Sequence, residues 1–244
     1  GDNVLSTWVN ANGSILNYGG SGAPMTTGIF DVTTNNNTVA YNGSGQAVRS
    51  GNYWNLNILS IASLSGNIII NGNLTINSGY TLHGLSYNTN IRGNLVNNGT
   101  FNTGTTVIFD GTILQHISGS SATQFNVLQI NNSNGLTLDY AINIIGVLVF
   151  NNGVINSSAT NMLTFNESSS WSNASPFSYV NGPVTKIGNT AFTFPCGKGT
   201  YAPAFISSPA TVTDAFTMEY FAAPSSNNSP ASMIGLDHVS AVDY

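Results

Sequence analysis

The sequence predicts an all-β chain: a right-handed parallel β-helix (a solenoid), followed by a small β cap or a β-sandwich-like element. Three observations predict this fold. No long stretch before residue 175 has helical periodicity, short apolar alternations bounded by Gly, Asn or Ser recur, and one motif returns after 21 residues. A β-sandwich, or tandem sandwiches, is the alternative, but a sandwich does not need a repeat at a fixed spacing of 21 residues.

The expected strands are short segments of alternating polarity separated by turn residues. Examples in chain order are 14–18, 38–41, 67–70 and 73–76. Asn-Gly and Asp-Gly dipeptides tolerate positive φ and therefore mark corners. They begin at Asn12, Asn42, Asn71, Asn98, Asp110, Asn134, Asn152 and Asn181. Asn side chains at such corners can form hydrogen-bonded ladders between stacked coils, which would explain the high Asn content.

Two repeats indicate that the coils stack, because a single coil cannot bury its own apolar face. In the shorter repeat, Gly72-Asn73-Leu74 returns as Gly93-Asn94-Leu95, and a third copy is Gly146-Val147-Leu148. In the longer repeat, 38–43 matches 106–111 after 68 residues. We interpret that spacing as about three coils.

The composition changes after about residue 175. Seven of the eight prolines lie beyond it, and aromatic residues cluster there. We therefore expect parallel β-helix coils over 1–175, and an all-β cap or the start of a second β domain over 176–244. A solenoid needs a cap to protect its last coil. The apolar alternation at 239–242 leads us to expect that this sequence belongs to a larger protein.

The low charge excludes several classes of protein. Only 5% of the 244 residues are charged, four are Lys or Arg, and the net charge is −5. A nucleic-acid partner requires a basic surface, which four basic residues cannot supply. Hydrophobic residues make up 41%, which is too many for a disordered chain. The longest apolar run, 140–150, is too short to cross a bilayer as a helix, so we expect no membrane insertion.

One segment of the last third resembles a known family. The stretches 179–188 (YVNGPVTKIG) and 192–199 (FTFPCGKG) are similar to a segment common in very large secreted proteins of Bacteroidetes. The Asn- and Gly-rich coils before them look like the repeats that precede it there. The resemblance implies a cell-surface, adhesin-like protein exported by the type IX secretion system. The position of Cys196 is usually apolar in that family, so the resemblance implies no role for this thiol.

Residues for catalysis are scarce. Polysaccharide lyases and glycoside hydrolases use the β-helix fold, and hydrolysis needs paired carboxylates. Asp110, Asp139 and Glu167 are the acids between 32 and 213, and Arg92 is the base of the middle coils. Asp110 and His116 could face each other across a turn, although Asp110 is more simply explained as a corner residue. We expect no enzyme activity, no catalytic residue, no cofactor and no metal site.

Two further motifs have simpler explanations than catalysis. The histidines, which are His83, His116 and His238, form no signature with Cys196, so we interpret this cysteine as a small buried apolar residue. A phosphate loop requires Gly five residues before the Gly-Lys pair and Ser or Thr after the Lys. The segment 197–200 meets neither requirement, and we expect a turn there.

Ligand-binding residues remain unknown at this point. A flat Thr array can order water in ice-binding solenoids, but Thr75, Thr137 and Thr164 follow no single period. The three tryptophans, which are Trp8, Trp54 and Trp171, could stack on sugar rings or fill the solenoid core.

The sequence favours a non-catalytic structural or adhesive segment of a large bacterial cell-surface or extracellular protein. Its partners would be surface glycans or other copies of itself, with assembly into a fibre or filament. Two alternatives remain open: a carbohydrate-active β-helix enzyme (a polysaccharide lyase or hydrolase), and an ice-binding solenoid.

Overall fold

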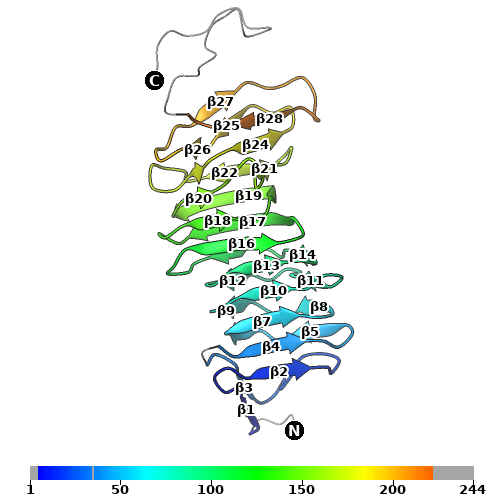
Figure 1. The fold of residues 1–244 in the computed structure, drawn as a ribbon. Coiled ribbons are helices and arrows are strands. Elements are labelled where there is room, and N and C mark those ends of the chain that lie inside the picture. Colours follow the sequence, from blue (N-terminus) through cyan, green and yellow to red (C-terminus); the bar gives the residue numbers. More distant parts are fainter. Residues whose placement is uncertain (1–4, 35, 222–244) are drawn as a thin grey trace, which may run out of the picture.

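The protein is an elongated stack of β-strands (Figure 1). The structure, a computed structural model, describes residues 5–34 and 36–221, and these contain 28 strands. No helix occurs in these two ranges, and thus none that could cross a bilayer. The predicted all-β parallel solenoid is confirmed. His238 and the alternation at 239–242 lie outside the described residues.

A ten-stranded sheet runs the length of the stack with one strand per coil, and its neighbours pair in parallel. At about 4.8 Å per strand, it extends for roughly 45 Å. Its strands are β2 (Ile15–Tyr18), β4 (Thr38–Tyr41), β7 (Asn55–Ile58), β10 (Leu74–Ile76), β13 (Leu95–Asn97), β16 (Gln115–Gly119), β18 (Leu136–Leu138), β20 (Ile155–Asn156), β23 (Val180–Asn181) and β26 (Cys196–Gly197).

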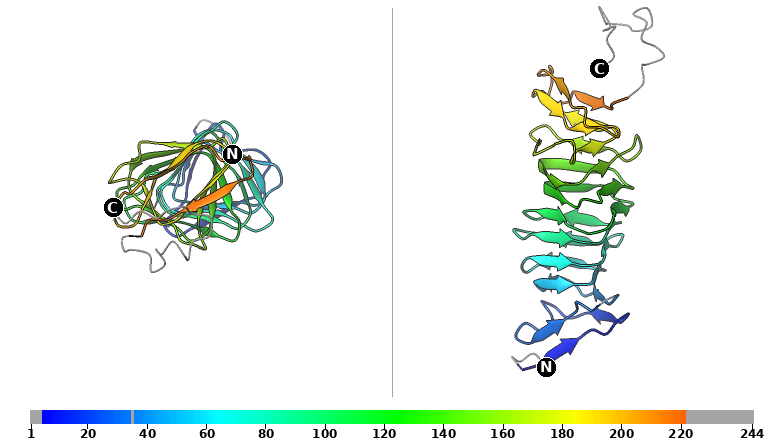
Figure 2. Two further views of the ribbon diagram at one scale, coloured as in Figure 1. Left: turned by 90° about the horizontal axis from the view of Figure 1, so that it is seen from above. Right: turned by 90° about the vertical axis from the view of Figure 1, so that its left-hand side faces the viewer.

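A fourteen-stranded sheet forms the other two faces. The view along the axis shows the successive coils lying over one another (Figure 2). The first face contains β5 (Gln46–Val48), β8 (Ile61–Leu64), β11 (Thr81–His83), β14 (Thr100–Asn102), β21 (Leu163–Phe165) and β24 (Val184–Ile187). The second contains β6 (Gly51–Tyr53), β9 (Ile68–Ile70), β12 (Thr89–Ile91), β15 (Val107–Phe109) and β22 (Ser170–Ser172). The long strands β17 (Thr123–Asn131) and β19 (Ile142–Asn152) pair with both faces and join them.

The two ends of the stack differ. Parallel pairing continues past residue 175, through β23 and β24 to β26. Two antiparallel pairs follow: β28 (Ala215–Met218) lies on β24, and β27 (Ala204–Ile206) pairs with β25 (Phe192–Phe194). At the other end, β1 (Thr7–Val9) pairs in parallel with β3 (Ile29–Asp31).

The core consists of apolar side chains stacked in rows along the axis. Val39, Leu56, Leu74, Leu95 and Ile117 occupy one row in register, and all are buried. Burying such a side chain stabilises the fold by about 1.5–3 kcal/mol. Alternate residues point inward on each short strand, so every coil adds one layer to the row.

The shorter repeat corresponds to stacked coils. Leu74 pairs with Leu95, as the 21-residue repeat predicts, and in the next strand of the same coils Leu82 pairs with Phe101. The third copy, at 146–148, lies in β19 of the other sheet and is not stacked on them.

The interpretation of the longer repeat as three coils is wrong, because its copies lie in different sheets. The segment 38–41 forms β4 of the ten-stranded sheet, whereas 107–109 forms β15 of the fourteen-stranded sheet. What the copies share is local: each leads to a buried glutamine, Gln46 or Gln115.

Each of these glutamines fastens one corner to the corner below. The Nε2 atom of Gln115 donates to the carbonyls of Ile91 (2.9 Å) and Gly93 (2.5 Å), and its Oε1 accepts from the Gly111 N–H (2.9 Å). Gln46 makes the same three kinds of contact at 2.7 Å each: its Nε2 donates to the carbonyls of Tyr18 and Gly20 in the corner below, and its Oε1 accepts from the Gly43 N–H. Buried corners in a solenoid need such partners because a buried unpaired backbone group is costly.

Glycine is required where successive corners touch. A Cβ atom at Gly93 would lie 2.2 Å from the Gly72 carbonyl oxygen, and one at Gly111 would lie 2.5 Å from the Arg92 carbonyl oxygen. Both distances are far below van der Waals contact, so these residues form a glycine column along the corner.

We predict that Gly93→Ala lowers the free energy of unfolding by about 1–3 kcal/mol, because the added methyl group must push two coils apart. Chemical denaturation measures the change. Thr112→Ala, on the exposed part of the next corner, is the control and should change it by less than about 0.5 kcal/mol. Equal midpoints for Gly93→Ala and wild type would contradict the close packing.

A buried polar cluster closes the core near the N-terminal end. The hydroxyls of Tyr41 and Tyr53 lie 2.9 Å apart; Tyr53 also donates to the Arg49 carbonyl (2.7 Å), and the Arg49 N–H donates to Tyr41 (3.1 Å). Burial raises the pKa of Tyr41 to about 12, and burial also raises the pKa of Tyr53. Both side chains therefore remain protonated in the folded chain above the ordinary tyrosine pKa of 10.0.

We predict that the protein loses stability as the pH rises from 10 to about 12. Below pH 10 tyrosine is protonated in both states; above it the unfolded chain ionises while folded Tyr41 does not, which favours unfolding by about 2–3 kcal/mol. Denaturation at several pH values measures this loss. Tyr41→Phe should flatten the dependence, and parallel curves for the variant and wild type would refute the assignment.

Lys186 is a fully buried cation in β24. Its Nζ donates to the carbonyls of Asn166 (2.6 Å), Glu167 (2.5 Å) and Ser169 (3.4 Å) and lies 5.2 Å from the Phe192 ring centre. Burial lowers the pKa of Lys186, and the Glu167 carboxylate offsets part of that shift. The ammonium group therefore supplies hydrogen-bond donors to the carbonyl groups of the 166–169 turn, and the role of Lys186 is structural.

Candidate functional site

A hollow lies at one corner of the solenoid, where the second face of the fourteen-stranded sheet leads into the ten-stranded sheet. We call it the corner groove. Its volume is about 870 Å³, and six of its fourteen lining residues are asparagine. The lining residues come from successive coils, so the groove runs along the stack. The lining residues are Asn36, Trp54, Asn55, Asn71, Gly72, Asn73, Arg92, Gly93, Asn94, Asp110, Gly111, Thr112, Ile113 and Asn131.

Differences in turn length create this hollow. One residue, Trp54, separates β6 from β7, and three residues separate β9 from β10 and β12 from β13. The turns on either side are longer: six residues precede β4, and five separate β15 from β16. The short turns thus form a floor, in which Gly72 and Gly93 contribute no side chain, and the longer turns form its ends.

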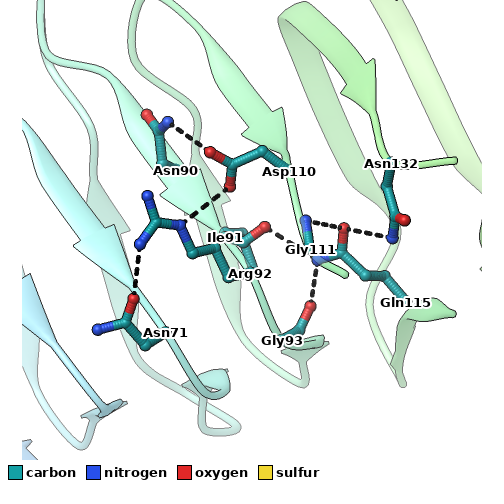
Figure 3. A network of polar contacts seen from close by, with 9 residues as sticks. All are labelled: Asn71, Asn90, Ile91, Arg92, Gly93, Asp110, Gly111, Gln115 and Asn132. Atoms are coloured by element: carbon teal, nitrogen blue, oxygen red, sulfur yellow. Dashed lines mark hydrogen bonds and ion pairs between the residues drawn. The ribbon is translucent and has the colours of Figure 1, made fainter. Parts of the chain in front are cut away.

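An ion pair occupies the middle of the groove (Figure 3). Arg92 Nε lies 3.7 Å from Asp110 Oδ1, Arg92 Nη1 donates to Asn71 Oδ1 (2.9 Å), and Asn90 Nδ2 donates to Asp110 Oδ2 (3.3 Å). Asp110 Oδ1 is buried and accepts no hydrogen bond in the described part of the chain, so Arg92 is its counter-charge. The Arg92 side chain is 46% exposed, and groups from the two neighbouring coils, Asn71 and Asp110, bind its guanidinium.

An asparagine ladder forms the wall next to the ten-stranded sheet. The Oδ1 atom of each member accepts the backbone N–H of the next coil: Asn55 from Asn73, Asn73 from Asn94, and Asn94 from His116, all at 2.9 Å. The ladder that the Asn-rich corners predict is therefore confirmed. The Nδ2 groups of Asn73 and Asn94 donate to no other described residue, so they are available at the surface.

Trp54 lies at the lower end of the groove and is partly exposed, outside the hydrophobic core. The other tryptophans are placed differently. Trp171 packs against the core and donates to the Thr193 carbonyl (2.6 Å). Trp8 lies in a small apolar hollow at the N-terminal end. Of the three, only Trp54 is combined with polar groups in a groove.

Asp110 and His116 do not face each other, and Asp110 lies in the turn between β15 and β16, as its interpretation as a corner residue predicts. Asp110 pairs with Arg92, whereas His116 Nδ1 lies 2.8 Å from Asp139 Oδ2 on the outer face of the ten-stranded sheet. A corner that turns the chain away from the groove separates the two side chains. Glu167 lies at the turn that Lys186 binds, far along the stack.

The remaining candidate residues do not converge on a second site. Cys196 is buried in the core, and burial raises the pKa of its thiol, as suits a small apolar residue. Residues 198–200, in the segment that fails the phosphate-loop pattern, form a bend. Lys198 in this bend pairs with Glu219 (3.0 Å). In the described ranges no three His, Cys, Asp or Glu side chains gather to hold a metal ion.

The threonines do not form one array. Thr75 and Thr137 belong to adjacent columns of the ten-stranded sheet, because Thr75 pairs with Val96 and Thr137 with His116. Thr164 belongs to the fourteen-stranded sheet.

Comparison with family models, with curated proteins and with solved structures found no match. The function is therefore argued from the groove and the stack alone. Sequence reasoning missed the groove itself, although the echo that aligns Asn73 with Asn94 contains part of its pattern.

We predict that Asn94→Ala increases the hydrogen-exchange rate of the His116 amide and lowers the free energy of unfolding by about 1 kcal/mol, because that N–H loses its acceptor. Asn94→Asp is the matched control: it keeps an oxygen in the ladder and should preserve protection of the amide. Exchange measured by NMR separates the two. Identical protection in Asn94→Ala and wild type would show that the ladder bond contributes nothing.

Proposed function

We propose that the chain is a non-catalytic structural and adhesive segment of a large bacterial cell-surface or extracellular protein. The observation that carries the proposal is the corner groove: a polar, open channel along the axis of a continuous stack. The stack provides a stiff support, and the groove provides a place for a ligand to lie across several coils.

The stack is suited to a mechanical role. Hydrogen bonds of both sheets run along the axis, so pulling the ends apart would load many of them together. The ladder and the two buried glutamines add side-chain bonds in the same direction. With only 5% charged residues, long-range repulsion between neighbouring copies is weak, which favours lateral packing into fibres.

A carbohydrate-active enzyme is the second candidate, because the groove contains Asp110 and Arg92. Hydrolysis requires a second carboxylate at about 5–9.5 Å from the first. Asp110 is the one carboxylate among the groove's lining residues, and its ion pair with Arg92 uses the charge of both. The geometry therefore favours binding over turnover.

We predict that the purified chain releases no product from polysaccharides that bind it. Assays for new reducing ends and for unsaturated uronates test hydrolysis and lyase chemistry separately, with known enzymes as positive controls. Release of either product, together with its loss in Asp110→Ala, would overturn the non-catalytic proposal. Retention of polysaccharide-coated beads on immobilised chain without product release supports it.

A further inference from the structure

We propose that the corner groove binds a neutral, linear glycan that lies along the solenoid axis, with its sugar rings above successive coils. This inference rests on the proposed function, because it assigns the adhesive site a ligand class. It follows from three features of the groove: its charge, the spacing of its amide groups, and the indole at its end.

The charge of the groove favours a neutral ligand. Arg92 and Asp110 are the charged residues among those that line it, and they neutralise each other. A polyuronate or another polyanion would need an unpaired cation, and it would also be repelled by the net charge of −5. Hydroxyl groups, in contrast, can bind to a guanidinium without displacing its carboxylate.

The spacing of the amide groups favours a linear ligand. Asn73 is exposed and Asn94 is half-buried, and their Nδ2 groups come from adjacent coils, about 4.8 Å apart. This spacing is close to the length of one pyranose residue in an extended glycan. The ladder bonds hold each Oδ1, so the amides are already oriented and each presents its N–H₂ outward as a donor. Little side-chain entropy is then lost on binding.

Arg92 adds donors in the same row. Its Nε faces Asp110 and its Nη1 donates to Asn71, whereas Nη2 has no partner among the described residues. The guanidinium is therefore held in place by two contacts, and its third nitrogen can donate hydrogen bonds to a ligand. Vicinal hydroxyls and ring oxygens of a sugar are suitable acceptors.

Trp54 supplies the apolar part of the site. The faces of sugar rings carry C–H groups that pack on aromatic surfaces, and an indole is the largest such surface. Trp54 is half-buried beside Gly72, where a Cβ atom would lie 3.0 Å from the indole Nε1. Because Gly72 has no side chain, the indole lies close to its backbone, and Trp54 stays partly exposed among the residues that line the groove.

Affinity electrophoresis and calorimetry with soluble xylan, β-1,3-glucan, β-1,4-mannan and polygalacturonate test the inference. We expect the chain to bind at least one of the three neutral glycans and not polygalacturonate. Trp54→Ala should weaken that binding about tenfold, as removal of an aromatic contact to a ligand does. Trp8→Ala, which removes the indole outside the groove, should leave it unchanged.

A second pair of variants keeps the inference testable if Trp54→Ala does not fold. Asn73→Asp preserves the ladder acceptor but removes the outward donor, so it should fold normally and bind the neutral glycan severalfold more weakly. Asn98→Asp places the same change on another corner and should bind as wild type does.

The outcomes separate this inference from the function it rests on. Binding to polygalacturonate alone, no binding to any neutral glycan, or binding unaffected by Trp54→Ala and Asn73→Asp would overturn the inference and leave a non-catalytic adhesive segment standing. Neutral-glycan binding that depends on Trp54 but is followed by cleavage would overturn the proposed function and retain the ligand class.

Discussion

The coils of this protein are parallel and hydrogen-bond to one another at a fixed spacing. This spacing constrains the corners, the composition and the shape of the surface. Each strand lies about 4.8 Å above the strand below it. The corners between strands must rise by the same amount, although corners have no regular ladder of their own. The chain meets this constraint with glycine where corners touch, as at Gly93 and Gly111, and with amide side chains where backbone groups need partners.

The same spacing explains the unusual composition. Like charges stacked at one-coil intervals would repel one another by about 1 kcal/mol per pair even in water. An amide carries both a donor and an acceptor and no charge, so identical asparagines can stack and bond, as Asn55, Asn73 and Asn94 do. The 5% of charged residues is therefore a consequence of stacking.

The groove follows from small irregularities in an otherwise regular stack. Short turns beside longer ones leave a hollow, and the glycine column keeps its floor low. The residues that line it do not need to be unusual, because they are the ladder amides themselves together with Trp54, Arg92 and Asp110. In this way the elements that hold the coils together also present polar groups to a ligand.

Much of the fold could be predicted from sequence because it depends on local patterns. Alternating strands, Asn-Gly corners and the 21-residue echo each report on a single coil or on two neighbouring coils, and the pairing of Leu74 with Leu95 confirms them. The 68-residue repeat misled because strand, glycine and glutamine can form the same local corner on any face. The similarity between these two segments indicates only that both form the same kind of corner. It does not indicate to which sheet each segment belongs.

The sequence by itself determined the all-β class, the stacked coils, the amide ladder and the near absence of charge. Each of these features depends only on residue types and on short spacings along the chain. Only the tertiary structure decided that Asp110 pairs with Arg92 and His116 with Asp139, that Trp54 lies in a groove, and where that groove begins and ends. The physical reason is that contacts between coils depend on the exact length of each turn. One added or missing turn residue moves a side chain to another column. A local sequence pattern does not show how the lengths of successive turns add up.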